Sequence, residues 1–353
     1  MSDERKMIGW RPWLCAIAVA MAWNVPLAAA SVYPSYVQRL SRLPQSTTQA
    51  LATQSIVGLD GAMGRNRRGY FHVRFQLGLH HWADAAIANR DEYAANRFLS
   101  ALGFGLAHET PVGTFELAVP KSLSRLPQSS AADRASGTAF FLSSAGSGVL
   151  ALQQSAWFQS APDLAAARTS LDADKVKLQL ALGRLKRDQA LLRAADARAP
   201  NRLLFDALAF VSLGLVLHDE DAIRSGREYQ HNALAQQSPK GFFVEGGGYD
   251  SSYNGVALAI GYRLLLMQPD DQVLANALHR ALLWQRSRIT SDGSILTQGN
   301  TRVSADSGER FLGREKQVDV PHCIEAFELA YVALADPQWR IVAERIIARY
   351  GSH

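Results

Sequence analysis

The stretch Gly241–Gly255, GFFVEGGGYDSSYNG, places aromatic, carboxylate and hydroxyl side chains around three consecutive glycines. Phenols and carboxylates can transfer protons to and from a bound ligand. The members suited to such work are Tyr249, Tyr253, Glu245 and Asp250. Because the stretch is too polar for a core element and too aromatic for a plain linker, we expect a ligand-facing loop that leads into a helix.

Two of these residues have structural interpretations of equal weight. Asp250 stands a few residues before the helical pattern Val256–Met267, at the expected start of that helix. An aspartate at such a position can cap the helix N-terminus. Tyr253 could be a buried aromatic residue whose hydroxyl is satisfied within the fold. Both alternatives stay open at this stage.

A second polar stretch, QGNTRVSADSGERFLGREKQVDVPH, ends at His322. Its cations would favour an acidic ligand, and they are Arg302, Arg310, Arg314 and Lys316. Asn300 is a further candidate for ligand binding in this stretch. The alternative is a charged loop that is simply solvated, as many loops are.

Repeated helical hairpins must position these loops. Apolar helical patterns alternate with amphipathic ones across short turns, each of which carries an aspartate suited to capping the second helix. The expected pairs are Phe71–Ala88 with Glu92–Ala107, Leu203–Leu217 with Ala222–Ala235, Ser252–Met267 with Gln272–Arg286, and Cys323–Leu334 with Gln338–Tyr350. The sequence therefore predicts an all-α fold of repeated hairpins.

A fifth hairpin, Ala139–Phe158 with Leu171–Ala194, is less regular. We expect a long loop or partial disorder over Ser122–Gly148, which is rich in Ser, Ala and Gly. Leucines recur every seven residues along the second helix. We interpret them as the core face of an amphipathic helix, with a coiled-coil seam as the alternative.

The connections between hairpins are long, whereas the turns within them are short. In a helical array this alternation places all long connections at one end, and long loops are usually functional. In these loops Gly113, Gly241 and Gly293 each stand close to apolar residues. We expect the glycines to end turns at positive φ, and the apolar residues to pack back on the helices.

Hairpins with a Gly-aromatic loop between pairs resemble the (α/α) toroids of carbohydrate-active proteins, such as polysaccharide lyases and glycoside hydrolases. The resemblance covers about residues 70–350 and is architectural, without a diagnostic family motif. It implies an incomplete toroid whose long-loop end is lined by aromatic and polar groups. It also implies a polysaccharide or oligosaccharide as partner. The sequence shows no third ligand beside His80 and His81 and no cofactor motif, so we expect no metal and no cofactor.

For a lyase acting on a uronate, the resemblance implies a base, a group that neutralises the carboxylate, and a proton donor for the leaving oxygen. The expected acids and bases are Tyr253, Tyr249 and His322; the expected substrate-binding residues are Asn254, Arg302, Phe243, Asn300 and Arg310. For a hydrolase, Glu245 or Asp250 would face Asp292, Asp306, Glu309 or Asp319 across the bond. A non-catalytic periplasmic glycan-binding or assembly protein is the third alternative.

Residues 1–30 read as a signal peptide, because a basic start precedes the apolar run Trp13–Trp23 and the small residues Ala28–Ala30. We therefore expect a periplasmic or secreted protein that leaves the membrane after cleavage. An irregular or helical extension is expected over 31–69, with one helix near Ser46–Val57, and the toroid over 70–353. The net charge of +5 is mild, and no long basic run is present, so nucleic acid is not an expected partner. The sequence leaves the oligomeric state open.

Other residues carry weaker signals. Cys323 would be the one cysteine left after cleavage, and it lies in an apolar helical pattern typical of a buried thiol. His80 and His81 are adjacent, so we expect them to face different sides of a helix and not to share a ligand. The sequence contains no P-loop, dinucleotide fingerprint or nucleophile elbow.

Overall fold

The computed structural model describes residues 34–55, 78–108, 131–304, 310–311 and 314–351. The expected signal peptide over 1–30, the loop glycine Gly113, and the first residues of the pattern Phe71–Ala88 lie outside the described residues. The compact unit that contains every described element is Pro34–His353.

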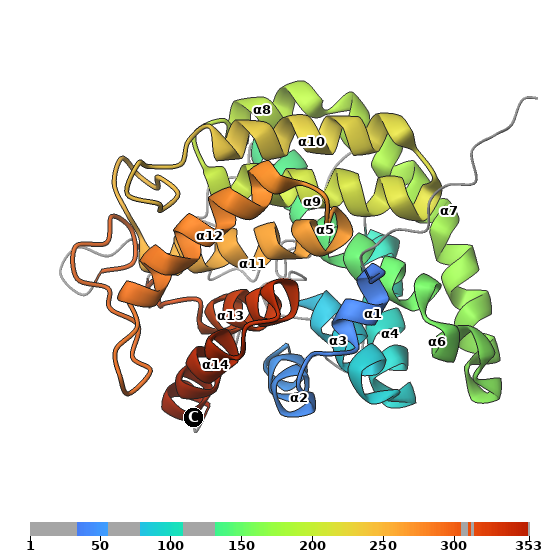
Figure 1. Cartoon of the computed structure of the whole chain (residues 1–353). Coiled ribbons are helices and arrows are strands. Elements are labelled where there is room, and N and C mark those ends of the chain that lie inside the picture. Colours follow the sequence, from blue (N-terminus) through green and yellow to red (C-terminus); the bar gives the residue numbers. More distant parts are fainter. Residues whose placement is uncertain (1–33, 56–77, 109–130, 305–309, 312–313, 352–353) are drawn as a thin grey trace, which may run out of the picture. The chain divides into compact units, whose positions relative to one another are not determined.

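The described chain consists almost entirely of helices joined in hairpins (Figure 1). The hairpin helices are α3 (Leu79–Asn89) with α4 (Glu92–His108), α5 (Ala131–Gln154) with α7 (Ala165–Arg187), α9 (Pro200–Leu217) with α10 (Glu220–Leu234), α11 (Ser251–Met267) with α12 (Gln272–Ser287), and α13 (Val320–Leu334) with α14 (Pro337–Tyr350). The remaining elements are α1 (Tyr36–Leu40), α2 (Gln45–Gln54), α6 (Ala156–Ser160), the 3-10 helix η3 (Pro162–Leu164), α8 (Gln189–Asp196), and the paired strands β1 (Arg310–Phe311) and β2 (Arg314–Glu315). The expected all-α fold of hairpins is confirmed.

The first helices of the hairpins form an inner ring. Along this ring α3 packs against α5, α5 against α9, α9 against α11, and α11 against α13. Helix α2 contacts both α3 and α13, and α1 contacts α3, α5, α11 and α13. The second helices α4, α10, α12 and α14 each pack on the outside of their own partner. Residues 36–54 therefore supply two helices that pack against the ring.

The inner helices are apolar because they are covered on most sides. Helices α5 and α9 are long and apolar enough to cross a membrane, but 100% and 83% of their apolar windows are buried inside the structure. The heptad leucines Leu171, Leu178, Leu185 and Leu192 are also buried, at 0–2% exposure. This confirms a core face on the fifth hairpin.

The loop expected over Ser122–Gly148 is wrong for its described part, since α5 begins at Ala131. Its small residues permit close helix packing: a Cβ on Gly148 would lie 2.2 Å from the Phe98 ring, and one on Gly146 would lie 2.3 Å from the Ser212 hydroxyl. The composition that suggested a loop is thus a consequence of tight contact with α4 and α9.

The hairpin turns follow one design. Asp91, Asp219, Asp271 and Asp336 each accept a backbone N–H in the first turn of the second helix, as expected. Three first helices end at a residue with positive φ, namely Arg90, His218 and Ala335. This left-handed residue reverses the chain within a short turn.

Two of the loop glycines behave as predicted. Gly241 and Gly293 have φ of 101° and 86°, and a Cβ on either would collide with a backbone carbonyl oxygen of a neighbouring helix. The apolar residues Phe242, Phe243 and Ile295 are 3–8% exposed and pack back on the helices. These turns anchor the loops 235–250 and 288–319 to the ring.

Candidate active site

Asp250 joins the two described long loops at the start of α11. Its Oδ1 accepts the N–H groups of Ser252 and Tyr253, and its Oδ2 accepts those of Arg302 and Val303. The residue is fully buried. The capping interpretation therefore accounts for both oxygens of Asp250, and its expected role as a catalytic carboxylate stays a prediction.

Three expected substrate-binding residues have similar internal roles. Asn254 accepts the N–H of Phe243 and donates to Gln285 Oε1, while Asn300 accepts the N–H of Ser251 and donates to Ser251 Oγ. Asn254, Asn300 and Phe243 are 1–5% exposed. These contacts hold the loops in place, and the expectation that the three residues contact a substrate stays a prediction.

The structure brings four of the residues singled out in the sequence close together, and we call them the rim group. They are Tyr253, Arg302, Lys316 and Glu245. The Arg302 guanidinium lies 4.5 Å from the centroid of the Tyr253 ring, and Lys316 Nζ donates a hydrogen bond to the Tyr253 hydroxyl. Arg302 also forms an ion pair with Glu245. Burial raises the pKa of Glu245 more than the Arg302 contact lowers it. Tyr253, Arg302 and Lys316 are each partly exposed.

Tyr249 belongs to a neighbouring aromatic group. Its ring contacts the rings of Phe242 and Trp284, Arg288 lies over it at 5.2 Å, and its hydroxyl donates to the Gln298 carbonyl. These contacts position loop 288–319 and leave Tyr253 as the stronger candidate for chemistry. Arg310 lies in β1, and its side chain is outside the described residues, as are Asp306 and Glu309.

His322 is a buried cation beside the rim group. Its Nδ1 lies 2.9 Å from Asp319 Oδ1 in an ion pair without hydrogen-bond geometry, and its Nε2 has no partner. Burial alone would lower the pKa of His322, but Asp319 outweighs it and raises the pKa to about 9. Asp319 in turn donates its N–H to Ser252 Oγ, next to Tyr253. At that pKa His322 carries its proton at neutral pH, and its expected role as a second base stays a prediction.

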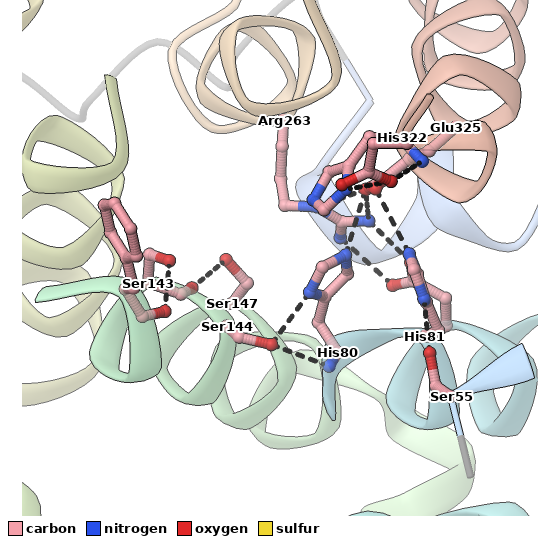
Figure 2. Close-up of polar contacts among 12 residues, drawn as sticks. Ser55, His80, His81, Ser143, Ser144, Ser147, Arg263, His322 and Glu325 are labelled. Atoms are coloured by element: carbon pink, nitrogen blue, oxygen red, sulfur yellow. Dashed lines mark hydrogen bonds and ion pairs between the residues drawn. The ribbon is translucent and has the colours of Figure 1, made fainter. Parts of the chain in front are cut away.

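Inside the ring lies a second polar group, the inner cluster, which consists of Tyr36, His80, His81, Asp84, Arg263 and Glu325. Figure 2 shows both histidines turned toward Glu325: His80 Nε2 lies 3.0 Å from Oε1 and His81 Nε2 lies 3.1 Å from Oε2. Arg263 donates to the same carboxylate and, at 2.6 and 3.1 Å, to both oxygens of Asp84. The adjacent histidines therefore share one partner, contrary to expectation.

The inner cluster is internally satisfied. His80 Nδ1 and His81 Nδ1 contact the hydroxyls of Ser144 and Ser55 at 2.8 and 2.9 Å (Figure 2). Burial lowers the pKa of His80 to about 4, so it is neutral. Burial would raise the pKa of Glu325, but the contacts with His80 and Arg263 hold it well below its usual value.

Among the described residues, His80, His81 and Glu325 form the one group that could hold a metal ion. Two imidazoles and a carboxylate are ordinary zinc ligands. The Arg263 guanidinium, however, already occupies Glu325 Oε1 and places a positive charge beside any ion there. Hydrogen bonds account for the cluster without a metal.

Asn201, in the first turn of α9, was missed by the sequence reasoning. Its Oδ1 is buried without a hydrogen-bond partner. It lies one turn from Phe205 on the same face of α9, and the Phe205 ring lies 6.2 Å from the His322 ring. Arg263 and Glu325 were missed as well, although each is a charged residue inside an otherwise apolar inner helix, which is a usable signal.

No protein-family model and no curated protein matches this chain. A solved structure does: the crystal structure of D-mannose isomerase aligns with a TM-score of 0.55 at 11% sequence identity. The match covers 91% of this chain and 88% of that chain. The likeness shows the fold, a helical toroid, and supports the architectural resemblance without pointing to a lyase or a hydrolase family.

Proposed function

We propose that this chain is an exported carbohydrate-active enzyme that removes a proton from the carbon beside the carboxyl group of an acidic sugar. The observation that carries the proposal is the contact of two cations with Tyr253: Lys316 at its hydroxyl and Arg302 over its ring. A negative charge on the phenol oxygen would therefore have two cations beside it. A tyrosine in this environment is suited to act as a base.

On a uronate polymer the reaction is a β-elimination. Tyr253 takes the proton from C5, the electron pair of that bond forms a double bond between C4 and C5, and the C4–O bond breaks. Tyr253 then gives this proton to the leaving oxygen, which leaves a neutral alcohol and restores the phenolate. Lys316, which donates a hydrogen bond to the Tyr253 oxygen, holds that oxygen in place.

A hydrolase has less support from the described carboxylates. Asp250 is capped by backbone groups, Glu245 is paired with Arg302, and Asp319 is paired with His322. Asp292 is bonded to Thr290 and Ser294 within its own turn. No pair among these is left to act across a glycosidic bond as hydrolysis requires.

An aldose–ketose isomerase is the second candidate, and the fold likeness to D-mannose isomerase is the observation that favours it. Isomerisation also begins with removal of a proton beside a carbonyl carbon. The same Tyr253 would take that proton and return it to the neighbouring carbon. The two candidates therefore differ in their substrate and product, not in the first step.

A panel of substrates separates the alternatives. Purified protein is incubated with uronate polymers and watched for the ultraviolet absorbance of an unsaturated sugar; new reducing ends without absorbance indicate hydrolysis. Free aldoses in deuterated water report isomerisation by deuterium uptake. We expect absorbance from at least one uronate polymer, and no product in any assay would contradict an enzymatic function and favour a glycan-binding protein.

Tyr253→Phe tests the assignment of the base. Loss of a general base lowers turnover by roughly 10²–10⁴-fold. Tyr93→Phe is the matched control, because Tyr93 is 63% exposed on the outer helix α4. Full turnover in Tyr253→Phe would exclude Tyr253 as the base.

A further inference from the structure

Two buried polar atoms near the rim group lack any partner. They are His322 Nε2 and Asn201 Oδ1, on residues that are 5% and 6% exposed. An unpaired buried polar group is costly, and an unpaired buried charge more so, unless a ligand or water completes it. The two atoms are complementary in kind, since the imidazolium donates and the amide oxygen accepts.

Their position links them to the proposed active site. Asp319, which pairs with His322, is held by the hydroxyl of Ser252, next to Tyr253. Asn201 and Phe205 begin α9, and the Phe205 ring meets His322 edge-on. Helices α9, α11 and α13 thus all contribute residues from their N-terminal turns, where the helix dipole favours negative charge.

We propose that His322 Nε2 and Asn201 Oδ1 form a subsite for an acidic sugar, in which His322 binds the carboxylate and Asn201 accepts a hydrogen bond from a hydroxyl of the same sugar. The inference rests on the proposed function and names the group that recognises its substrate. Asp319 holds the other side of the imidazole ring, so Nε2 keeps its proton for the carboxylate. A cation at the carboxylate also stabilises the charge that develops there when C5 loses its proton.

The subsite replaces the residues expected for this role. The Asn254 side chain is hydrogen-bonded to Phe243 and Gln285, and Arg302 is paired with Glu245. His322 carries a buried positive charge whose Nε2 is unbonded. A charge-assisted hydrogen bond to a carboxylate is about twice as strong as a neutral one.

Binding of matched sugars tests the proposal without any turnover. Calorimetric titration compares glucuronate with glucose, galacturonate with galactose, and mannuronate with mannose; within each pair the acid and its neutral counterpart differ at C6. We expect the acid to bind at least about ten-fold more tightly in one or more pairs, as a bond to a charged group provides. Equal affinities in every pair, or no binding of any sugar, would overturn the subsite.

Two variants separate the two residues. His322→Gln should abolish the roughly ten-fold tighter binding of the acid. Its affinity for the neutral sugar should stay within about two-fold of the wild-type value. Asn201→Leu should weaken the acid and the neutral sugar by the same factor, about three- to ten-fold, because it removes a bond to a hydroxyl. His231→Gln and Asn232→Leu, both exposed on α10, are the matched controls. An unchanged preference in His322→Gln contradicts the proposal.

The wild-type protein provides a second measurement that needs no variant. The groups facing His322 are Asp319, Glu325, His81 and Arg263. Because the pKa of His322 is raised to about 9, its positive charge is present below that pH and lost above it. The advantage of the acid should therefore disappear as pH rises through 9, while the neutral sugar is unaffected; a preference that persists at pH 10 refutes the role of His322.

The outcomes also separate this inference from the proposed function. Preferential binding of a uronate without turnover of any polymer keeps the subsite and refutes the enzyme. Turnover of a uronate polymer, with the acid preference unchanged in His322→Gln, keeps the enzyme and refutes the subsite. Tyr253→Phe, with turnover lost and uronate binding kept, supports both.

Discussion

The rim group and the inner cluster are both rich in charged residues, yet they differ in what remains available. In the inner cluster every member is 0–4% exposed, and the hydrogen bonds between Arg263, Asp84, Glu325 and the histidines complete one another. In the rim group Tyr253 and its cations are partly exposed, and the adjacent His322 has an unbonded nitrogen. A high density of charged groups therefore does not by itself indicate a ligand-binding site. Exposed charged groups and polar atoms without a hydrogen-bond partner are the better indication.

The largest expected effect comes from breaking the inner cluster. Arg263→Met leaves the carboxylates of Asp84 and Glu325 buried without their shared cation. Removing one partner of a buried ion pair costs about 3–5 kcal/mol. Urea unfolding should show a loss of that size. Arg340→Met is the matched control, since its pair with Glu344 is exposed and is worth about 0.5 kcal/mol; equal losses in the two variants would contradict the comparison.

The next effect concerns Glu328, on α13 beside the inner cluster. Burial raises the pKa of its carboxyl to about 7 in spite of the hydrogen bond from Thr47. The pKa of Glu328 is about 7 in the folded chain and 4.5 in the unfolded chain, so the unfolded chain loses this proton at lower pH. The free energy of unfolding therefore falls as pH rises from about 4.5 to 7.

Glu328→Gln should remove that dependence. Relative to wild type, the variant should gain stability between pH 5 and pH 8 by up to roughly 3 kcal/mol, at about 1.4 kcal/mol per pKa unit. Denaturant unfolding at the two pH values measures the gain. Glu344→Gln, at an exposed position, should show no such change, and parallel curves for Glu328→Gln and wild type would refute the assignment.

A smaller effect is expected in the rim group. Lys316→Met removes the donor at the Tyr253 hydroxyl and should lower kcat by roughly 10- to 100-fold, because a charge-assisted hydrogen bond is worth about 1.5–3 kcal/mol. Lys316→Arg, which keeps the charge, should recover part of the rate. Thermal unfolding should change little, which distinguishes this variant from Arg263→Met. A drop in Tm without any loss of kcat would make Lys316 a structural residue.

The sequence was sufficient for the helices, because apolar periodicity and aspartate caps are local signals. Asp219, Asp271 and Asp336 cap the helices that the pattern predicted. It failed over Ser122–Gly148, where glycine and serine reflect close packing of α5 and not a loop. Local composition does not distinguish these two causes.

The site was predictable in part. The meeting of Tyr253 and Arg302 follows from two polar loops at one end of the helices. The sequence did not predict which polar residues of those loops bind the backbone. Asp250, Asn254 and Asn300 are side chains that can bind either a ligand or the backbone, and here they bind the backbone. Asn201 was missed because its significance is a missing partner, which only coordinates reveal.

Asp250 has a consequence for how experiments on this protein are interpreted. One carboxylate joins the first turn of α11 to the backbone at Arg302, the two segments that carry the tyrosine ring and the guanidinium above it. A variant at this aspartate should loosen that spacing and so lower the turnover proposed for Tyr253. Such a loss would resemble the removal of a proton-transferring group, although it would come from a change in backbone position.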